Sequence, residues 1–569
     1  MSRVFSEQEL VRRESLQKLV DLGIDPYPAH LFEVDAYSSS IKSSHDGDSN
    51  DQKKVKIAGR LMSRRIMGKA AFAELQDSKG RIQLYFNRDE ICTDEDKTMY
   101  NTVFKKLLDI GDFIGVEGYV FTTKVGEKTV MVKSFKLLSK ALKPLPLPKT
   151  DGEGNTFDEF NNPELRYRQR YADLVVNPKV KEVFIKRTKL FTAMRTFFNN
   201  SGYFEVETPI LQSIPGGAAA RPFKTHHNSL DIPMFMRIAC ELYLKRLIVG
   251  GFDGVYEFAK TFRNEGMDRT HNPEFTMMEI YVAYKDYNWM MDLTEKLLEF
   301  CATEVNGSSK SIFGEHEINF KAPYARVTMA ESIEHYTGFD ILGKSENEIR
   351  EAAKAMGIEL DETMGKGKII DEIFGEKCEA NYIQPTFITD YPKEMSPLTK
   401  VHRSNPDLTE RFELIICGKE LANAYTELND PIDQRARFED QVKLAGRGDD
   451  EATEFIDQDF LRALEYGMPP TSGMGIGMDR LIMFLTNNAS IQEVLFFPQM
   501  KPEVKQVAMS DDEKVVFNML KANSPFELIE LKIQSGLSNK KWDKVIKGLT
   551  KSGIAKVHKT EEGLFVEVI

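Results

Sequence analysis

Residues 262–281 combine side chains that are suited to holding an anionic ligand. The runs FRNE, HNPEF and MMEIY follow one another there, with a polar loop after the first. A strand, a loop and a second strand would bring Arg263, Glu265 and Glu279 near one another. Arginine is suited to forking onto a carboxylate or a phosphate. An ordinary ion-pair network is the alternative, and this segment alone leaves both open.

A glycine-rich run forms a second candidate site. The sequence GMGIGMDR spans residues 473–480 and precedes the helical pattern LIMFLTN. Alternate glycines on a strand remove one row of side chains, so a flat ligand can lie against the backbone. Arg480 would then sit at a strand–helix junction, where phosphate binding is favoured. The run is neither a dinucleotide fingerprint nor a Walker loop, because its glycine spacing differs and no GK[ST] follows.

Two carboxylates can meet on one face of a predicted hairpin. The runs RFELIIC and ELANAYTEL can pair through a turn at Gly418-Lys419, which places Glu413 and Glu420 on the same face. Two carboxylates on one face suit Mg²⁺ that is bound together with phosphates. A solvated acidic strand face is the alternative.

The elements that would position these residues fall into separate regions. Strands are predicted at 55–65, 71–77, 81–87, 112–122 and 128–138, with a helix at 95–109 after the third, which is the order of an OB-fold barrel. Long helices at 179–201, 240–250, 288–303, 434–448 and 457–466 alternate with strand-like runs in a large domain. Three helices and a hairpin in the last 66 residues resemble a winged helix. The predicted domains are 1–52 (helix and mobile loop), 53–142 (OB-fold), 143–160 (stiff linker), 161–503 (large domain with a helical insertion about 344–379) and 504–569 (tail).

Composition limits the class of protein. With 41% hydrophobic and 29% charged residues, the 569-residue chain is neither collagen-like nor mostly disordered. It has no apolar run of the roughly 18 residues that a membrane span needs. Five scattered cysteines and an N-terminus without an apolar region lead us to expect a cytoplasmic protein without a disulfide framework. The net charge of -12 argues against a dedicated nucleic-acid binder, but residues 53–81 hold nine bases and only two acids.

The three signature motifs of class II aminoacyl-tRNA synthetases resemble, in order, residues 199–209, 262–281 and 473–480 of this chain. The preceding OB-like domain is similar to that of the subclass charging Asp, Asn or Lys. The chain resembles lysyl-tRNA synthetases over about residues 1–503, most closely at 214–223, 241–246, 383–388 and 426–430. This implies an α+β fold, with an antiparallel sheet flanked by helices after a β-barrel OB-fold.

The resemblance also implies an activity. ATP would activate L-lysine to lysyl-adenylate with release of pyrophosphate, and the lysyl group would pass to tRNA(Lys) for protein synthesis. The protein would be a homodimer through residues 184–210. No protein nucleophile is needed, because catalysis would rest on positioning and charge stabilisation.

Site residues carry over from the family one by one. For ATP, Arg263 would bridge the lysine carboxylate and the α-phosphate and Arg480 would hold the γ-phosphate; both are expected catalytic residues. Phe275 would stack on adenine, although plain core packing is its alternative. The other expected ATP contacts are Glu265, His271 and Gly475, and Glu413 and Glu420 look like the Mg²⁺ ligands.

For lysine, the resemblance implies Gly217 and Glu241 at the α-ammonium, Asn423 at the carboxylate, and Glu427 and Tyr281 at the ε-ammonium, with Glu279 close by. A cationic side chain needs a buried anion at the far end of its pocket, which points to Glu427. A regular strand would turn Asn423 and Glu427 away from Glu413 and Glu420, so we predict a bulge near Ala422.

Phe72 and Gln83 resemble the family's anticodon readers, with Arg64 and Glu127 as further contacts. An aromatic ring offers a stacking platform and Gln can read a Watson–Crick edge; for Phe72, barrel core is the alternative. The tail could contact RNA or be a docking face.

Some positions depart from the family pattern. Cys240 stands where Pro is common, Ala422 and Ala424 stand where Gly is common, and residues 268–271 shift the loop arginine by one place. Two other functions are disfavoured. A protein-lysylating relative would lack the OB-like domain, whereas residues 55–140 are present here. An inactive RNA-binding relative is expected to lose Arg263, Arg480 or the Glu413/Glu420 pair, and all four residues are present.

Overall fold

The computed structural model describes residues 5–44, 53–150, 156–157, 160–218, 220–362, 364–445, 456–502, 509–522, 524–551, 554–560 and 563–568. Outside these ranges lie residues 45–52 of the predicted mobile loop, part of the predicted linker, Ala219 and the end of the helix predicted at 434–448. The chain divides into two compact units, Met1–Gln499 and Met500–Ile569, which are treated separately below.

The first element is α1 (Glu7–Asp21), which begins with a capping box between Ser6 and Glu9. A second helix, α2 (Ser38–Ser44), lies where a mobile loop is predicted, so that part of the prediction is wrong. Two groups of Ser38, its backbone N–H and its hydroxyl, donate to the carboxylate of Asp77 at 2.6 and 2.7 Å. Ile41 is buried with the barrel core. These contacts order a segment whose polar composition alone predicts a loop.

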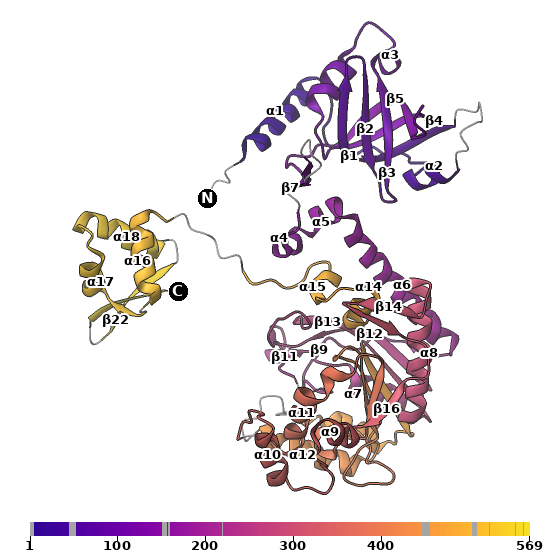
Figure 1. Cartoon of the computed structure of the whole chain (residues 1–569), viewed down its shortest axis with the longest axis vertical. Coiled ribbons are helices and arrows are strands. Elements are labelled where there is room, and N and C mark those ends of the chain that lie inside the picture. Colours follow the sequence, from indigo (N-terminus) through magenta and orange to yellow (C-terminus); the bar gives the residue numbers. More distant parts are fainter. Residues whose placement is uncertain are drawn as a thin grey trace. The chain divides into compact units, whose positions relative to one another are not determined.

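The five predicted strands form a closed barrel with the order β1-β2-β3-β5-β4 (Figure 1). Their bounds are β1 (Lys54–Met67), β2 (Ala70–Gln76), β3 (Arg81–Asn87), β4 (Phe113–Thr122) and β5 (Lys128–Ser139). Between β3 and β4 lie α3 (Arg88–Ile91) and the predicted helix, which is a π-helix, η1 (Met99–Leu107). Alternate residues point inward, as period-two strands require. In β2 these are Ala71, Ala73 and Leu75.

The segment between barrel and large domain contains more structure than a linker. Two short strands, β6 (Lys149–Thr150) and β7 (Thr156–Phe157), pair with each other. The helices α4 (Pro163–Arg168), α5 (Arg170–Val176) and α6 (Pro178–Asn200) follow. Asn162 caps α4 with its side chain and Pro163 occupies the first turn, where proline needs no hydrogen-bond donor. The helix predicted at 179–201 is confirmed, because α6 spans nearly the same residues.

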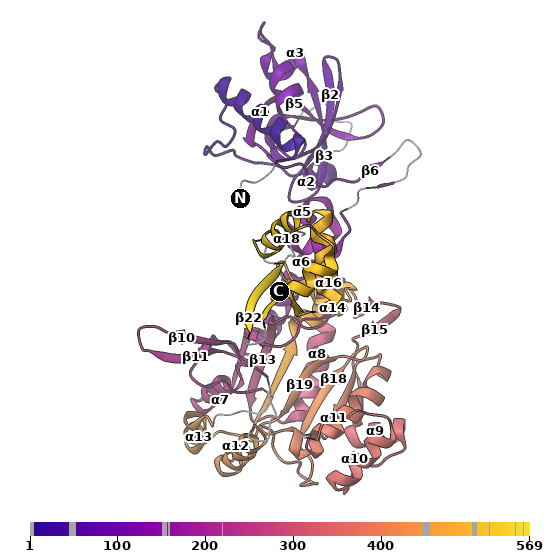
Figure 2. The same cartoon turned by 90° about the vertical axis from the view of Figure 1, so that its left-hand side faces the viewer.

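The large domain is built on an eight-stranded sheet with the order β16-β17-β18-β19-β20-β13-β12-β8. The pairs β8–β12 and β16–β17 are parallel and the other neighbours are antiparallel. Figure 2 shows β13, β19 and β18 of this sheet with α8. The strands are β8 (Phe204–Glu205), β12 (Gly254–Phe262), β13 (Glu274–Ala283), β16 (Ala325–Thr328), β17 (Thr386–Thr389), β18 (Arg411–Ile415), β19 (Glu420–Thr426) and β20 (Thr471–Gly477).

The helices α6, α8 (Tyr287–Asn306) and α14 (Met478–Thr486) pack against this sheet and share one apolar core. That core contains Leu190 of α6, Met290 of α8, Met474 of β20 and Ile482 of α14. The remaining helices are α7 (Glu241–Val249), α9 (Met329–Thr337), α12 (Pro431–Ala445), α13 (Gln458–Glu465) and α15 (Ile491–Val494), with short 3-10 turns at Glu379–Asn381 and Lys393–Met395. Smaller strands are β9 (Leu211–Gln212), β10 (Lys224–His227), β11 (Ile232–Met236), β14 (Lys310–Phe313) and β15 (His316–Asn319).

The predicted insertion about 344–379 is helical, with α10 (Glu346–Ala355) and α11 (Lys366–Lys377). Its core includes Ile349 and Ile370 and continues into Met329 of α9 and Ile388 of β17. The insertion therefore packs against the sheet edge through its own apolar cluster.

The C-terminal unit has its own core. The helices α16 (Asp511–Ala522), α17 (Leu528–Ser535) and α18 (Asn539–Lys551) surround Leu520, Leu531 and Trp542. A three-stranded sheet, ordered β21-β23-β22, completes the unit with β21 (Phe526–Glu527), β22 (Ala555–Thr560) and β23 (Gly563–Val568). Among the described residues of the whole chain, no helix is long and apolar enough to span a membrane.

Candidate active site

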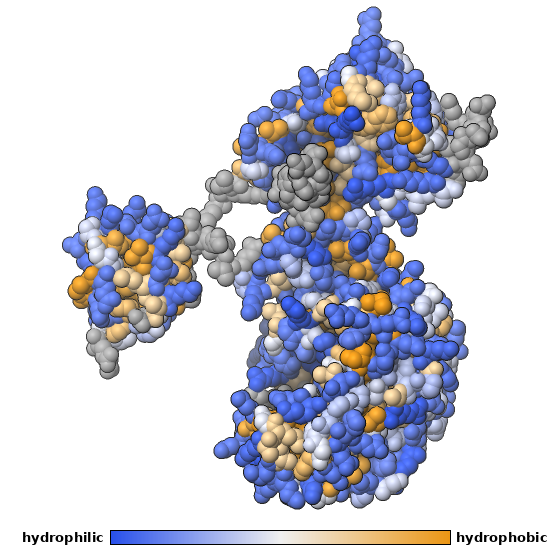
Figure 3. All heavy atoms as spheres, in the orientation of Figure 1, coloured by the Kyte–Doolittle hydropathy of each residue, from blue (hydrophilic) through white to orange (hydrophobic). Residues whose placement is uncertain are grey.

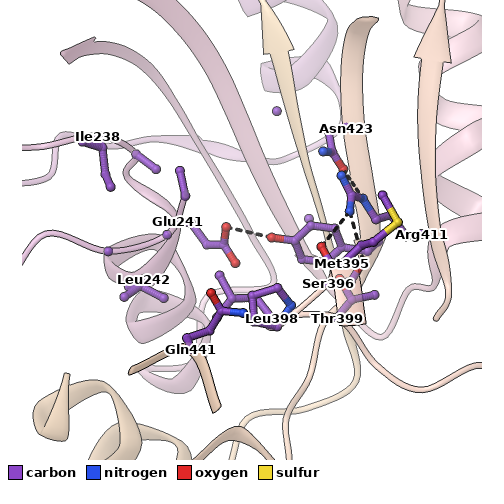
Figure 4. Close-up of a pocket in the computed structure, with 18 of the residues that line it drawn as sticks. Ile238, Glu241, Leu242, Met395, Ser396, Leu398, Thr399, Arg411, Asn423 and Gln441 are labelled. Carbon is purple, nitrogen blue, oxygen red and sulfur yellow. Dashed lines mark hydrogen bonds between the residues drawn. The ribbon is translucent and has the colours of Figure 1, made fainter. Parts of the chain in front are cut away.

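A cavity of about 800 Å³ lies in the large domain, and most of the residues predicted to bind lysine and the metal line it. Nine predicted site residues line it: Gly217, Glu241, Arg263, Glu279, Tyr281, Glu413, Glu420, Asn423 and Gly475. Figure 4 shows Glu241 on one side of this cavity and Arg411 with Asn423 on the other. The lining does not include Glu265, His271, Phe275, Glu427 or Arg480, whose positions are described below.

The hairpin of β18 and β19 carries the predicted bulge. Glu413 pairs with Asn423 and Leu414 with Ala422, but Ile415 pairs with Glu420, so Leu421 is the extra residue. The turn contains Cys417 and Gly418, both with positive φ. The bulge is confirmed one position from Ala422. It puts Glu420 on the same cavity wall as Glu413 and Asn423.

The glycines of β20 form a row without side chains between β13 and β19, the two strands that carry residues expected to bind lysine. Gly475 pairs with Glu279 of β13 on one side and with Asn423 of β19 on the other. A Cβ on Gly473 would lie 2.2 Å from Oε1 of Glu427 and 2.3 Å from Cε1 of Tyr281. Gly473 is therefore required by the space that these two side chains occupy.

A buried lysine that the sequence reasoning missed lies at the end of this row. Nζ of Lys245 donates to Oε1 of Glu241 at 2.6 Å and forms an ion pair with Oε2 of Glu427. The hydroxyl of Tyr425 donates to Oε2 of Glu241 at 2.7 Å, a bond drawn in Figure 4. Burial alone would lower the pKa of Lys245, but Glu241 and Glu427 together raise it. Burial raises the pKa of Glu427 well above its usual range, although Lys245 opposes this.

Lys245 could have been found from its position. It follows Glu241 by four residues on a predicted helix, which is the spacing of an ion pair on one helix face. No local signal connects Lys245 to Glu427, because the two residues come from distant segments and meet only through the packing of α7 against the sheet.

Glu279 is buried beside this group. The backbone N–H of Cys240 donates to its Oε1 at 3.2 Å and the Tyr281 hydroxyl donates to its Oε2 at 3.3 Å. Burial, with the nearby charge of Glu241, raises the pKa of Glu279 to about 7. A proline at position 240 would have no N–H to donate. The departure at Cys240 therefore supplies a hydrogen bond to a cavity carboxylate.

Arg263 has the environment of an anion-binding residue. Its guanidinium carbon lies 5.3 Å from the centre of the Phe275 ring, and it lines the cavity. Within the part of the chain that the structure describes, its Nε is buried without a hydrogen-bond partner. An unpaired buried donor is costly unless a ligand satisfies it. Phe275 is partly exposed and absent from the apolar core cluster of the sheet, which removes plain core packing as its role.

Arg480 and His271 lie together near Glu420. Nη2 of Arg480 is 3.2 Å from Nε2 of His271, and its Nη1 is 3.6 Å from Oε2 of Glu420. The other ring nitrogen of His271 is 2.7 Å from Asp268. Glu265 is exposed and accepts the backbone N–H of Arg221 at 3.3 Å. Glu279 pairs with Glu257 in the middle of β12, away from the strand end at Phe262 that Glu265 follows, so the register does not pair the two carboxylates as predicted.

The carboxylates on the β18–β19 wall suit a hard cation. Arg411, a second residue missed from the sequence, donates to Glu413 at 2.5 Å and to Asn423 at 3.1 Å. Burial raises the pKa of Glu413 to about 8, Glu420 adds to the effect and Arg411 opposes it. Carboxylate oxygens are the donors that Mg²⁺ prefers. Among the described residues, no group of three or more His, Cys, Asp and Glu is placed to hold a metal.

Asp479, in the third motif segment, contacts the second segment and helix α6. Its Oδ1 is 2.6 Å from Nη1 of Arg187 in α6, and its Oδ2 accepts the backbone N–H of Thr276 in β13 at 2.8 Å. Asp479 is buried at the start of α14, next to Arg480. This contact sets the position of Arg480 relative to the ligand-bearing strands.

Comparison with known proteins identifies the family. A family model described as tRNA synthetases class II (D, K and N) matches residues 162–501, and one for an OB-fold nucleic acid binding domain matches residues 55–138. A lysine–tRNA ligase of Christiangramia forsetii is 72% identical over 563 residues, which cover 99% of this chain and 98% of that protein. The chain belongs to the class II lysyl-tRNA synthetases.

Two other lysine–tRNA ligases match over a shorter length. The protein from Porphyromonas gingivalis is 68% identical over 88% of this chain and 86% of its own. The protein from Azobacteroides pseudotrichonymphae is 64% identical over 88% of this chain and 99% of its own. The protein from Azobacteroides pseudotrichonymphae is therefore shorter than this chain by about the length of the C-terminal unit.

The barrel of this lysyl-tRNA synthetase presents an outer face with three of the four expected anticodon residues. Phe72 pairs with Tyr85 across β2 and β3, and their rings lie 5.0 Å apart. Phe72 points away from the barrel interior, which excludes the core alternative. Thr129 links the other two residues, because its hydroxyl is 2.7 Å from Oε1 of Gln83 and 3.2 Å from the carbonyl of Glu127.

Arg64 lies apart from that face. A register shift between Leu61 and Ser63 makes Arg64 pair with Ala73, whose side chain points into the barrel. Arg64 donates to the carbonyl of Phe104 in η1. Its neighbour Arg65 pairs with Phe72 and so shares the outer face. The sequence alone could not show this exchange, because it depends on the bulge.

Proposed function

We propose that the cavity activates L-lysine with ATP, and that its anionic end selects the substrate. The chain is a member of the lysyl-tRNA synthetases, whose reaction is lysyl-tRNA synthesis. The observation that supports this site assignment most strongly is the buried group of Glu241, Glu279 and Glu427 around one internal cation, Lys245.

Charge balance explains why this group suits lysine. Bound ammonium groups would favour the ionised form of all three carboxylates, and three ionised carboxylates with one internal ammonium leave two negative charges for the ligand to compensate. Uncompensated buried charge is costly. L-lysine supplies two ammonium groups, one at Cα and one at Cε, which would neutralise the group. Aspartate and asparagine supply only one ammonium, and aspartate adds a further carboxylate. A site of this kind rejects uncharged analogues strongly.

The geometry separates the two ammonium sites. Glu427 and Tyr281 lie at the far end, where Gly473 leaves them room. Gly217 lies beside Glu241, since a Cβ on Gly217 would be 3.1 Å from Cβ of Glu241. We assign the first pair to the ε-ammonium and the second to the α-ammonium, with Asn423 near the carboxylate.

Arg263 would act at the reacting centre. An oxygen of the lysine carboxylate forms a bond to the α-phosphorus while the bond to the β-phosphate bridge breaks, and pyrophosphate leaves. Both reactants are anionic, so a guanidinium between them reduces their repulsion and stabilises charge on the phosphoryl oxygens. Phe275, beneath Arg263, would stack on adenine, and Arg480 with His271 would hold the outer phosphates. Glu265 and Gly475 complete the proposed ATP contacts.

Glu413 and Glu420 would hold Mg²⁺ that arrives with ATP. Bound there, the cation would neutralise phosphate charge. Arg411 would keep Glu413 oriented toward the cavity through the hydrogen bond described above.

We further propose that Phe72, Gln83 and Glu127 read the anticodon of tRNA(Lys), with Arg64 supporting the adjacent barrel end. A homodimer through residues 184–210 is supported by exposed apolar side chains there: Ile185 is 49% and Phe204 58% exposed. Because the family's reaction serves translation, we place the protein in the cytoplasm. The intact barrel also disfavours a protein-lysylating role, since such relatives lack it.

The deciding experiment is amino-acid-dependent ATP–pyrophosphate exchange. We expect exchange with lysine and none above background with aspartate or asparagine. Exchange with aspartate alone would overturn the substrate assignment. Transfer of labelled lysine to tRNA(Lys), and not to protein, is expected in the second step.

A further inference from the structure

The C-terminal unit carries a stripe of lysines along one helix. The residues Lys540, Lys544, Lys547 and Lys551 are all exposed on α18. Their spacing of four, three and four residues puts them on one helical face. The buried residues Trp542, Val545 and Leu549 occupy the opposite face. We call the four lysines the α18 stripe.

The α18 stripe lacks the compensation seen at neighbouring lysines. Lys514 lies 3.2 Å from Asp511 and Lys541 lies 3.1 Å from Asp512. No ion pair involves the stripe among the residues that the structure describes in this unit. The helix contains five lysines and one acid, Asp543. Like charges three and four residues apart destabilise a helix, so an anionic partner would relieve this repulsion.

The fold turns the stripe outward. The helices α17 and α18 are joined by a short turn at Gly536, which has φ +65°, in the manner of a helix-turn-helix. Gly548 lies four residues after Lys544, on the flank of α18 between the stripe and the buried face, and a Cβ there would lie 2.0 Å from Oε1 of Glu513 in α16. This close approach packs α16 against α18 and leaves the stripe at the surface.

We propose that the α18 stripe binds the phosphate backbone of RNA, and specifically of the tRNA substrate; the choice of tRNA rests on the proposed function. Lys551 follows Lys540 by eleven positions. At the rise of an α-helix the stripe is therefore about 16 Å long, with its charges about 5–6 Å apart. Lysines in such a row are point charges suited to successive phosphates. The major groove of A-form RNA is too narrow for a helix, so the contact is to the backbone and independent of base sequence.

The surface favours RNA over a protein partner for this helix. The exposed apolar residues Ile529 and Ile533 lie on α17, not on the stripe. Figure 3 shows hydrophilic and hydrophobic side chains mixed on the visible face of this unit. A protein partner would be expected to cover Ile529 and Ile533, whereas a polyanion needs only the lysines.

The test compares two variants of the full-length chain that lose the same number of charges. One combines Lys544→Gln, Lys547→Gln and Lys551→Gln on the stripe. The control combines Lys514→Gln, Lys521→Gln and Lys532→Gln on α16 and α17. The equilibrium affinity for tRNA(Lys) is measured from 50 to 200 mM salt. We expect the stripe variant to bind about tenfold more weakly at low salt, with a slope of log K against log[salt] reduced by about two to three.

Failure of the stripe proposal and failure of the proposed ligase activity would give different results. An equal slope and affinity in the stripe and control variants would overturn the proposal. Recovery of the slope in a Lys→Arg triple variant of the stripe would support it, because charge is retained. The stripe substitutions should reduce affinity for an unrelated RNA of the same length by the same factor as for tRNA(Lys), as expected for backbone contact, and a loss confined to tRNA(Lys) would contradict it. Absence of lysine-dependent pyrophosphate exchange in the unsubstituted chain would instead overturn the ligase site assignment.

Discussion

Nζ of Lys245 lies 2.6 Å from Oε1 of Glu241, and both side chains are buried, with Glu241 in the wall of the cavity. The same ammonium pairs with Glu427. One protein cation therefore holds together the two carboxylates that we assign to the two ammonium groups of lysine. In the absence of substrate, it offsets part of their charge.

Lys245 should be a positioning residue, and Lys245→Met should raise the KM for lysine much more than the KM for ATP. The substitution leaves Glu241 and Glu427 without their internal cation, at a cost of about 3–5 kcal/mol in the free energy of unfolding. Pyrophosphate-exchange kinetics and thermal unfolding measure the two effects.

A double variant separates charge from packing at this site. Adding Glu427→Gln to Lys245→Met removes a carboxylate as well as the ammonium, so part of the lost stability should return even though lysine activation does not. If the double variant is no more stable than Lys245→Met, the pairing with Glu427 is not what makes Lys245 important.

The pKa of about 7 at Glu279 predicts a pH dependence of lysine binding. The ammonium groups of lysine favour the ionised carboxylate, so binding weakens as Glu279 gains its proton. The KM for lysine should therefore rise as pH falls below about 7, approaching tenfold per pH unit. In Glu279→Gln this rise of the KM at low pH, the acid limb of the pH profile, should be absent. A pH profile unchanged by that substitution would assign the titration to another group.

Cys240 should shift this pH limb through its backbone. Its N–H donates to Glu279 and so favours the ionised form. Cys240→Pro removes the donor, and the limb should move to higher pH. Cys240→Ala keeps the N–H and loses only the thiol, whose smaller contribution also favours the ionised form, so the pH dependence should move up less than in Cys240→Pro. The two profiles are compared by lysine titrations in the exchange assay, and coincident profiles would contradict the role of the N–H.

Gly473→Ala should damage the lysine end of the cavity selectively. The added methyl would lie 2.2 Å from Oε1 of Glu427 and 2.3 Å from the Tyr281 ring, so both must move. We expect the KM for lysine to rise at least about tenfold, as a misplaced contact worth about 1.4 kcal/mol would produce. Gly475→Ala is the matched comparison, because its methyl would meet the flexible end of Met277 at 3.0 Å. A larger lysine defect in Gly475→Ala would refute this geometry.

Phe72→Ala should weaken tRNA aminoacylation by removing a stacking platform worth about 1–3 kcal/mol per base. That corresponds to a loss of roughly five- to 140-fold in kcat/KM for tRNA(Lys). Phe113→Ala, at another partly exposed aromatic of the same barrel, is the control. Steady-state aminoacylation measures both, and equal losses would mean that the effect comes from the barrel's stability.

Sequence periodicity predicted much of this protein because the relevant signals are local. Alternating strands and their turns predicted the barrel, and glycines at 473, 475 and 477 marked a strand without side chains on one side. The hairpin at Gly418 followed from local pattern, whereas its bulge was predicted from the family resemblance, which gives Asn423 and Glu427 a role in lysine binding. The positions of Arg263 and Arg480 at strand ends also followed from local pattern.

Tertiary structure decided what depends on distant segments. Lys245 pairs with Glu427, and Arg187 with Asp479, only because α7 and α6 pack against segments far along the chain. The bulge in β1 exchanged Arg65 for Arg64 on the outer barrel face. Ser38 and Ile41 formed a helix in a segment whose composition predicts a loop. Local pattern determines which face a residue occupies; burial and charge pairing across the fold determine which residues share a site.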